Sequence, residues 1–335
     1  MTSKERAIAT IKGEPVDTIP VFPLLMGFSA KRSGFTYKQF ASNGRAMAEA
    51  QLRILDDFDI DVITACSDAF RISTDLGGDV VYCVNTPPYI KQPIITSSQD
   101  LSRLSKIDVT RPGSRCADRV LGVEEMVKAA GDTHLIVGWV DFPFAEACSC
   151  CGVQNFMLLI LDEPALAHAI LQFLTDIVID FALAQLEKGA PMIGCGDAAA
   201  SLVSNETFRE FALPYEKQVV DKIHSHNGLV KTHICGNTTN ILESETDNGS
   251  DLYNVDHMVD LKHATDVFSS HGRAFKGNID PVYILSSSPE QVFAAAKSCI
   301  DLADSKKYFL SAGCEIPPNT PDENLKAFCM AAKQS

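Results

Sequence analysis

His233 and Cys235 lie two residues apart near the end of a short apolar run, and Cys314 lies near the end of another run. Residues i and i+2 of a β-strand point to the same side, so the imidazole and the first thiol can face one space. Two thiolates and one imidazole form the ligand set of an open zinc site that keeps a fourth position for substrate. We therefore predict that these three residues bind Zn²⁺. The competing interpretation is that they are ordinary buried side chains.

The chemistry of this ligand set indicates which class of reaction it could support. Two thiolates neutralise the charge of Zn²⁺, and a substrate thiol that takes the fourth position loses its proton. The complex then carries a net negative charge, and its sulfur stays nucleophilic. Such a site suits transfer of an alkyl group to sulfur better than Lewis-acid hydrolysis, which needs a more electrophilic ion.

Acidic residues follow five of the expected strands. We expect the group to form an acidic funnel at one mouth, where like charges raise some pKa values, although a lone Asp at a strand end is often a helix N-cap. Asp197 is the preferred candidate for a catalytic acid, a hydrogen-bonding group or a fourth ligand, and Glu315 is a weaker one. His257 and His263 are expected on the surface. The five aspartates are Asp68, Asp141, Asp197, Asp256 and Asp280.

The chain has 11 cysteines, an odd number, and a disulfide framework is not expected in the reducing compartment that we infer for it. Cys148, Cys150 and Cys151 lie together, but no His or Cys at a finger-like spacing accompanies them. We expect a structural or incidental role for these three thiols.

The elements that must position these residues are short apolar runs separated by amphipathic stretches. Eight such runs, alternating mostly with helices, predict a parallel sheet closed into a (β/α)8 TIM barrel, whose active groups lie at the C-terminal ends of the strands. We expect residues 1–335 to form a single domain, with an N-terminal extension and an added hairpin between the second and third strands. The expected strands are 20–25, 61–66, 135–140, 191–195, 229–235, 252–255, 274–278 and 308–312. The expected helices are 43–58, 164–188, 205–226, 288–303 and one that starts at 321.

Composition narrows the classes of function. The 335 residues include 29 basic and 43 acidic side chains, which gives a net charge of −14. This balance argues against a nucleic-acid partner, since phosphate binding needs a basic face. No run of 18 uncharged apolar residues and no signal-peptide pattern is found, so we expect no membrane association and a cytoplasmic location.

Four segments carry a resemblance to a known family: GDAAASLVSNETFREFALPY, KTHICGNTT, KGNIDPV and LSAGCEIPPNTPDEN. They resemble the uroporphyrinogen decarboxylase superfamily, and within it the zinc- and cobamide-dependent branch that includes the methylcobamide:coenzyme M methyltransferases. The resemblance runs over nearly the whole chain. It implies a (β/α)8 barrel and a thiol-activating zinc whose ligands map onto His233, Cys235 and Cys314.

One departure bears on the reaction. Decarboxylases of the superfamily carry an N-terminal motif of the form R-Q-A-G-R that holds the carboxylates of their substrate. The corresponding stretch here is LLMGFSAKRSGF, which has Lys31 and Arg32 but no such motif. A porphyrinogen with many carboxylates would meet few cations, which argues against decarboxylation.

We therefore expect a methyltransferase that moves a methyl group between a corrinoid and a zinc-activated small molecule, foremost a thiol. The sequence has no D-x-H-x-x-G motif, so the corrinoid (methylcobalamin or cob(I)alamin) is expected on a separate corrinoid protein. Two alternatives stay open: a metal-free decarboxylase, and a zinc-binding component of a methyltransferase complex without turnover of its own. The direction of transfer, the identity of the small molecule and the oligomeric state do not follow from the sequence.

Overall fold

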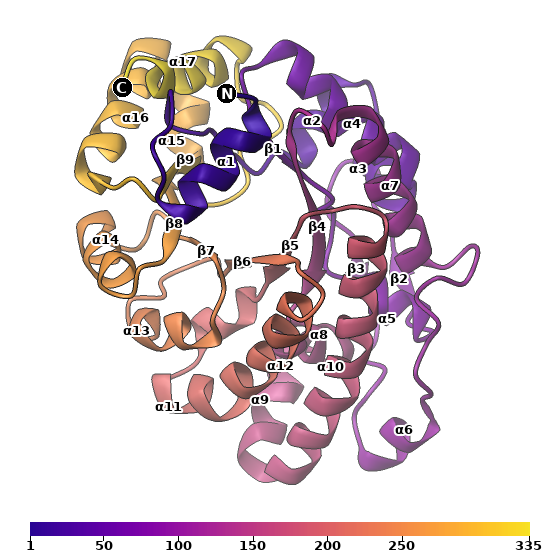
Figure 1. The fold of residues 1–335 in the computed structure, drawn as a ribbon. Coiled ribbons are helices and arrows are strands. Elements are labelled where there is room, and N and C mark those ends of the chain that lie inside the picture. The colour runs from indigo at the N-terminus through magenta and orange to yellow at the C-terminus, as the bar shows by residue number, and fades with distance from the viewer.

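Seven parallel strands form a curled sheet at the centre of the computed structural model, which describes residues 1–335 (Figure 1). Their order in the sheet follows the chain, as expected for repeated strand–helix units. Most of their residues are buried and apolar, because helices cover the outer face and side chains fill the inside. The strands are β1 (Val62–Thr64), β4 (Leu135–Asp141), β5 (Met192–Gly196), β6 (Leu229–His233), β7 (Leu252–Asn254), β8 (Ala274–Ile279) and β9 (Tyr308–Ala312).

The prediction of a regular strand at 20–25 is wrong. It makes only two isolated parallel bridges, from Val21 to Leu310 and from Leu24 to Glu315. On its other side, the amide of Asp61 donates to the carbonyl of Val21 at 3.0 Å. The segment therefore lies between β1 and β9. Pro20 and Pro23 lack amide hydrogens, so a continuous ladder cannot form there.

Helices cover the outside of the sheet, and most begin at the signals seen in the sequence. Asn43 caps α4 through its side chain, and Ser288 caps α16 in a capping box ahead of Pro289. The longer helices are α1 (Ser3–Lys12), α4 (Gly44–Asp57), α7 (Arg115–Ala130), α8 (Pro143–Cys151), α9 (Val153–Asp162), α10 (Pro164–Glu187), α12 (Leu213–His224), α14 (Leu261–Ser270), α16 (Pro289–Ala303) and α17 (Asp322–Lys333). The short ones are α2 (Gly27–Arg32), α3 (Tyr37–Ser42), α5 (Arg71–Asp75), α6 (Ser98–Arg103), α11 (Asn205–Thr207), α13 (Leu242–Glu245) and α15 (Pro281–Ser286).

The expected helix 205–226 is interrupted. It divides into α11, a π-helical turn (Phe208–Ala212) and α12. Pro214 lies at the start of α12 and cannot donate to the preceding turn, which accounts for the change of hydrogen-bond pattern.

Helix α10 is long and apolar enough to cross a membrane, which the sequence interpretation did not foresee. Over its most apolar window 56% of the residues are buried in the fold. The helix packs against β4, α8 and α12, so its apolar surface is part of the interior of the barrel wall.

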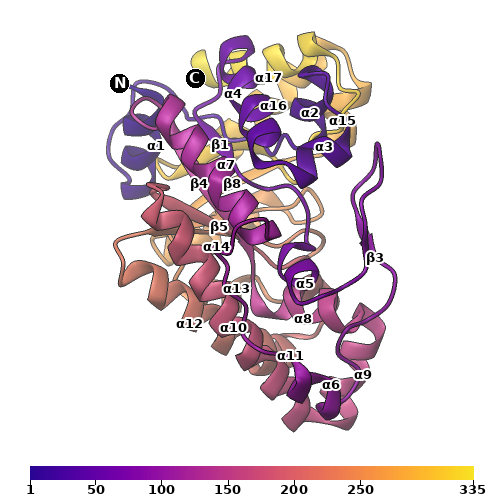
Figure 2. The same cartoon turned by 90° about the vertical axis from the view of Figure 1, so that its right-hand side faces the viewer.

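Helix α1 closes the end of the barrel opposite the strand C-termini. Its Ala7 and Ile11 pack in one buried cluster with inward side chains of the strand starts, among them Leu135, Met192 and Leu252. The two chain termini lie close together in both views (Figures 1 and 2).

Between β1 and β4 the chain adds a segment to the barrel. In this segment β2 (Val80–Val81) and β3 (Tyr89–Ile90) pair antiparallel over two residues each, at the place where the sequence predicts an added hairpin. Figure 2 shows this segment at one side of the molecule, away from the main sheet.

Candidate metal centre

Three side chains at or just beyond the ends of β6 and β9 converge at the C-terminal end of the sheet. Nε2 of His233 lies 2.9 Å from Sγ of Cys235 and 3.9 Å from Sγ of Cys314, and the two sulfurs are 3.0 Å apart. All three possible ligand atoms lie within 4.8 Å of one another. The structure therefore brings together the three residues that the sequence singles out, although Cys235 lies two residues beyond the end of β6.

The surroundings fix these side chains. The ring of His233 packs edge-on against Trp139, at 5.8 Å between centroids. Asn254 donates to the carbonyl of Gly313 at 2.7 Å, which holds the turn that leads to Cys314. A Cβ at Gly313 would lie 2.3 Å from the amide nitrogen of His257, so only glycine allows this close approach.

The protonation of the group matches a metal-binding set. Hydrogen bonds from Cys235 and His233 lower the pKa of Cys314, and the pKa of Cys235 is raised because its proton is the one shared. Burial lowers the pKa of His233, which keeps the imidazole neutral. One thiolate, one thiol and a neutral imidazole lose a single proton when they bind a divalent ion.

The donor atoms fit a tetrahedral zinc ion. Bond lengths of about 2.3 Å to sulfur and about 2.0 Å to nitrogen place such ligand atoms about 3.5 to 3.8 Å apart. The sulfurs of Cys235 and Cys314 would separate by less than about 1 Å from their 3.0 Å distance to reach this geometry. Three protein ligands would leave one coordination position of such an ion for another ligand.

Glycines on β5 make room inside the barrel. A Cβ at Gly194 would lie 2.5 Å from the ring of Trp139, and one at Gly196 would lie 2.6 Å from Oδ1 of Asp141. These two inward side chains of β4 therefore occupy space that β5 leaves free. Asp141 forms a buried ion pair with Arg71 at 2.5 Å, which holds its carboxylate at the mouth.

Two lysines project into the barrel below the metal-binding group, and the sequence interpretation missed both. Lys231 on β6 and Lys276 on β8 are each 1% exposed. Burial lowers the pKa of Lys231 to about 8, so its ammonium form still predominates at pH 7. The only sequence signal is a Lys at an inward position of an otherwise apolar strand.

Asp197 is not part of the three-residue group. Its side chain is fully buried, and burial together with the neighbouring Glu216 raises its pKa well above the usual range. Burial raises the pKa of Glu216 as well, to about 7. Neither carboxyl oxygen of Asp197 has a hydrogen-bond partner, while the Asp197 amide donates to the carbonyl of His233 at 2.9 Å. Its catalytic role stays a prediction, and the structure shows it supporting the strand end that carries His233.

The expected acidic funnel is wrong in detail, since the other strand-end aspartates have partners of their own. Asp68 pairs with Arg115 at 3.2 Å, Asp256 with His257 at 3.0 Å, and Asp280 caps α15 through the Val282 amide at 2.8 Å. Arg71 and Arg115 were not foreseen, because their partners lie far away in the sequence.

The remaining candidates lie outside the group. Cys148, Cys150 and Cys151 are buried in α8, and burial raises the pKa of each. His257 and His263 are exposed. Glu315 accepts a hydrogen bond from the Gly27 amide at 2.6 Å, and burial raises its pKa to about 7.

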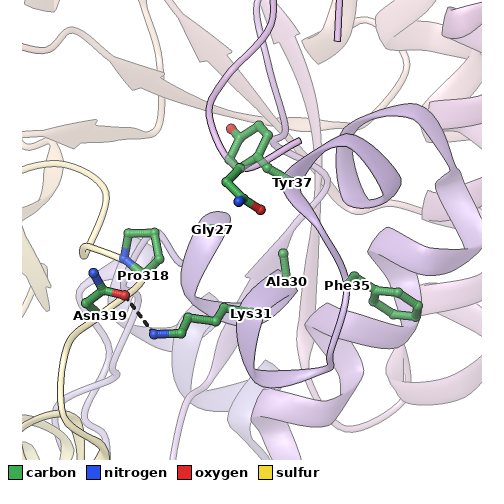
Figure 3. A pocket seen from close by; sticks show the side chains of 8 residues that line it. Gly27, Ala30, Lys31, Phe35, Tyr37, Pro318 and Asn319 are labelled. Carbon is green, nitrogen blue, oxygen red and sulfur yellow. Dashed lines mark hydrogen bonds between the residues drawn. The ribbon is translucent and has the colours of Figure 1, made fainter. Parts of the chain in front are cut away.

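A pocket of about 380 Å³ opens beside Glu315, between α2 and the loop after β9 (Figure 3). Phe35, Tyr37 and Pro318 supply apolar surface, and Lys31 donates to Asn319 at 2.7 Å across its edge. Lys31 is the only charged side chain in its lining.

Comparisons with known proteins agree with this architecture. Residues 2–335 match the model of the family described as uroporphyrinogen decarboxylase (URO-D). A methylcobamide:CoM methyltransferase from Methanosarcina acetivorans is 28% identical over 344 residues, covering 99% of this chain and 98% of the relative. A uroporphyrinogen decarboxylase from Synechococcus sp. is 26% identical over 346 residues, covering 99% and 97%.

The fold is also that of a solved structure. A methyltransferase from Methanosarcina mazei superposes with a TM-score of 0.90 at 23% identity, covering 100% of this chain and 99% of the other. Because the family model spans all but the first residue, this chain belongs to the uroporphyrinogen decarboxylase (URO-D) family.

Proposed function

We propose that this protein is a zinc-dependent methyltransferase that moves a methyl group between a corrinoid and a thiol. The observation that supports this most is the convergence of His233, Cys235 and Cys314 at the mouth of the barrel. The relative from Methanosarcina acetivorans is named for a reaction between a methylcobamide and CoM, which is the same class of transfer.

His233, Cys235 and Cys314 would hold Zn²⁺, and the bound ion would supply the charge that removes the proton of a substrate thiol at neutral pH. The chain contributes a neutral imidazole and a pair of thiols that share a proton. Trp139 packs against the imidazole and fixes its ring. The pocket between α2 and the loop after β9 is the proposed place for the rest of the small molecule.

The proposed transfer is an in-line displacement. The substrate sulfur attacks the methyl carbon, and the carbon–cobalt bond breaks with both electrons staying on cobalt. The proton of the thiol leaves to solvent before the attack. The chain holds the sulfur so that the methyl group can approach from the open side of the barrel, which converts an encounter in solution into an aligned one.

We further propose that a separate corrinoid protein presents the corrinoid at the barrel mouth, that the chain acts as one domain, and that it works in the cytoplasm. Neither nucleic acid nor a membrane is a proposed partner. The net charge of −14 disfavours phosphate backbones, as the sequence already indicates.

Metal-free decarboxylation is the competing function, because a uroporphyrinogen decarboxylase is among the relatives. A substrate with many carboxylates needs several cations. The pocket offers Lys31, whereas the neighbouring Arg32 is already paired with Asp57 at 2.7 Å and also with Asp322. This shortage of free cations in the pocket favours methyl transfer.

Metal analysis of the purified protein tests the proposal first. We expect one equivalent of zinc, lost in His233→Ala and Cys314→Ser. Methylcobalamin and a panel of thiols are then mixed with the protein, and the corrinoid absorbance change is followed. Zinc without any methyl transfer supports the non-catalytic component. A metal-free protein that decarboxylates uroporphyrinogen, with Cys314→Ser as active as wild type, supports the decarboxylase.

A further inference from the structure

Two lysine side chains lie inside the barrel under the metal-binding group, and their bonding differs. Lys276 donates to the carbonyl of Phe22 at 2.7 Å and to Oγ of Ser311 at 2.8 Å. Nζ of Lys231 makes no hydrogen bond to a protein atom. It lies over the ring faces of Trp139, at 4.6 Å, and Phe22, at 5.5 Å. Lys231 is therefore a buried cation without an anionic partner in the fold.

Lys231 faces the metal-binding group along its own strand. It precedes His233 by two residues on β6, so both side chains point into the barrel, about 7 Å apart along the strand. Trp139 contacts both of them.

The charges explain why such a cation would be kept. A buried ammonium group is unfavourable because it lacks bulk water, and burial together with Lys231 lowers the pKa of Lys276 well below its usual range. The fold tolerates Lys231 beside Lys276 at a cost that a nearby negative charge offsets. Two thiolates cancel the charge of Zn²⁺, but a third thiolate, from the substrate, leaves one net negative charge at the site.

We propose that Lys231 is a positioning residue that provides the counter-charge for the substrate thiolate at this group. The inference rests on the proposed function. Binding releases one proton from the thiol to solvent, and Lys231 keeps its own proton throughout. Its charge favours the thiolate complex over the complex with water, which has no net charge.

This role predicts that loss of the Lys231 charge weakens thiol binding without weakening metal binding. A cation close to the site does not help a divalent ion to bind, but it helps an anionic ligand to bind to that ion. Lys231→Met, which keeps most of the side-chain volume, should therefore bind metal as tightly as wild type. Its affinity for a thiol at pH 7 should fall about tenfold or more, as expected for a charge removed at this distance.

The test uses the full chain loaded with Co²⁺, whose thiolate absorption bands report binding directly. The probe is 2-mercaptoethanol, which has no charged tail that could contact another residue. We measure the metal affinity by competition with a chelator, and the thiol affinity from pH 6 to pH 9. Lys231→Arg keeps the charge and should bind the thiol nearly as wild type does. Lys231→Gln serves as a second neutral variant, should Met fail to fold.

The outcomes are distinct. Weaker thiol binding with unchanged metal affinity, rescued by Arg, supports the inference. Thiol binding unchanged in the neutral variants overturns it, and so does an equal loss of metal and thiol affinity, which a merely structural role would produce. If the wild-type chain binds no metal or no thiol, the proposed function itself fails.

Discussion

Lys231 and His233 project into the barrel from one strand, two residues apart, and the indole of Trp139 lies against both side chains. The indole fits there because the facing position on β5 is Gly194, where a Cβ would come within 2.5 Å of its ring. The metal-binding imidazole and the buried cation are therefore held by the same packing contact.

Replacing Gly313 with alanine should displace Cys314. The added Cβ would lie 2.3 Å from the amide nitrogen of His257, so the backbone must shift. We expect a loss of zinc affinity of at least about tenfold, with a destabilisation of about 1–3 kcal/mol as in other overpacked sites. Gly34→Ala is the control: its φ of 77° is strained for alanine, but nothing lies within 4 Å of the added atom. Equal zinc affinity in both variants would contradict this.

Arg71→Met should destabilise the fold strongly. Arg71 is fully buried and pairs with Asp141 at 2.5 Å, so the substitution leaves a buried carboxylate without its partner. Losses of about 3–5 kcal/mol in the free energy of unfolding are typical. Urea denaturation measures the loss, and Arg71→Met combined with Asp141→Asn should recover much of it.

The matched control is Arg53→Met, because Arg53 is 60% exposed and lies 3.9 Å from Asp57. Surface pairs of this kind contribute about 0–1 kcal/mol. If the Arg71 variant were no less stable than the Arg53 variant, the buried pair would not have the role that we assign to it.

Glu216 should make the stability of the fold fall as the pH rises. Burial raises its pKa from 4.5 to about 7, so the folded state keeps a proton that the unfolded state releases first. The contribution is fully present below pH 4.5 and is lost as the pH rises toward 7, at up to about 1.4 kcal/mol per pH unit.

Glu216→Gln tests this, since its amide oxygen can still accept from Asn248, which donates to Glu216 at 2.9 Å. Urea denaturation at a series of pH values should show a shallower slope for the variant between pH 4.5 and 7. Glu210→Gln on the exposed face should keep the wild-type slope. Parallel curves for all three proteins would argue against titration of Glu216 in this range.

Alkylation should separate the cysteines into two classes. Cys148, Cys150 and Cys151 are buried with raised pKa values, so iodoacetamide should modify them only after unfolding. Cys314 is partly exposed with a lowered pKa and should react in the metal-free native protein. Added Zn²⁺ should protect it, and mass spectrometry of peptides gives the extent at each site. Reaction at Cys314 that zinc does not slow would count against the metal centre.

Much of the architecture could be predicted from the sequence. Hydrophobic periodicity predicts all seven regular strands to within two residues at each end, because buried parallel strands are short apolar runs with clear limits. The first strand failed because Val21 and Leu24 are apolar, while Pro20 and Pro23 deny the segment its ladder. Apolar composition alone does not predict whether a segment can form a continuous strand ladder.

The site was predictable in part for a related reason. His233 and Cys235 share a strand end, so their proximity follows from local geometry, and the sequence also selects the distant Cys314, which the structure brings to 3.0 Å. That they bind a metal stays a prediction. Arg71 contacts Asp141 and Lys231 contacts Trp139, both on β4, and one sequence contains no sign of these contacts.

The barrel wall is discontinuous where the segment 20–25 meets the last strand, β9. Only two bridged residue pairs join 20–25 to the last strand and the loop after it: Val21 pairs with Leu310 of β9, and Leu24 pairs with Glu315, next to Cys314. His233 and Cys235 belong to the continuous part of the wall, about 80 residues away in the chain. An ion bound by all three residues would therefore cross-link the end of β9 to the end of β6, close to the part of the barrel wall that has the fewest strand bridges.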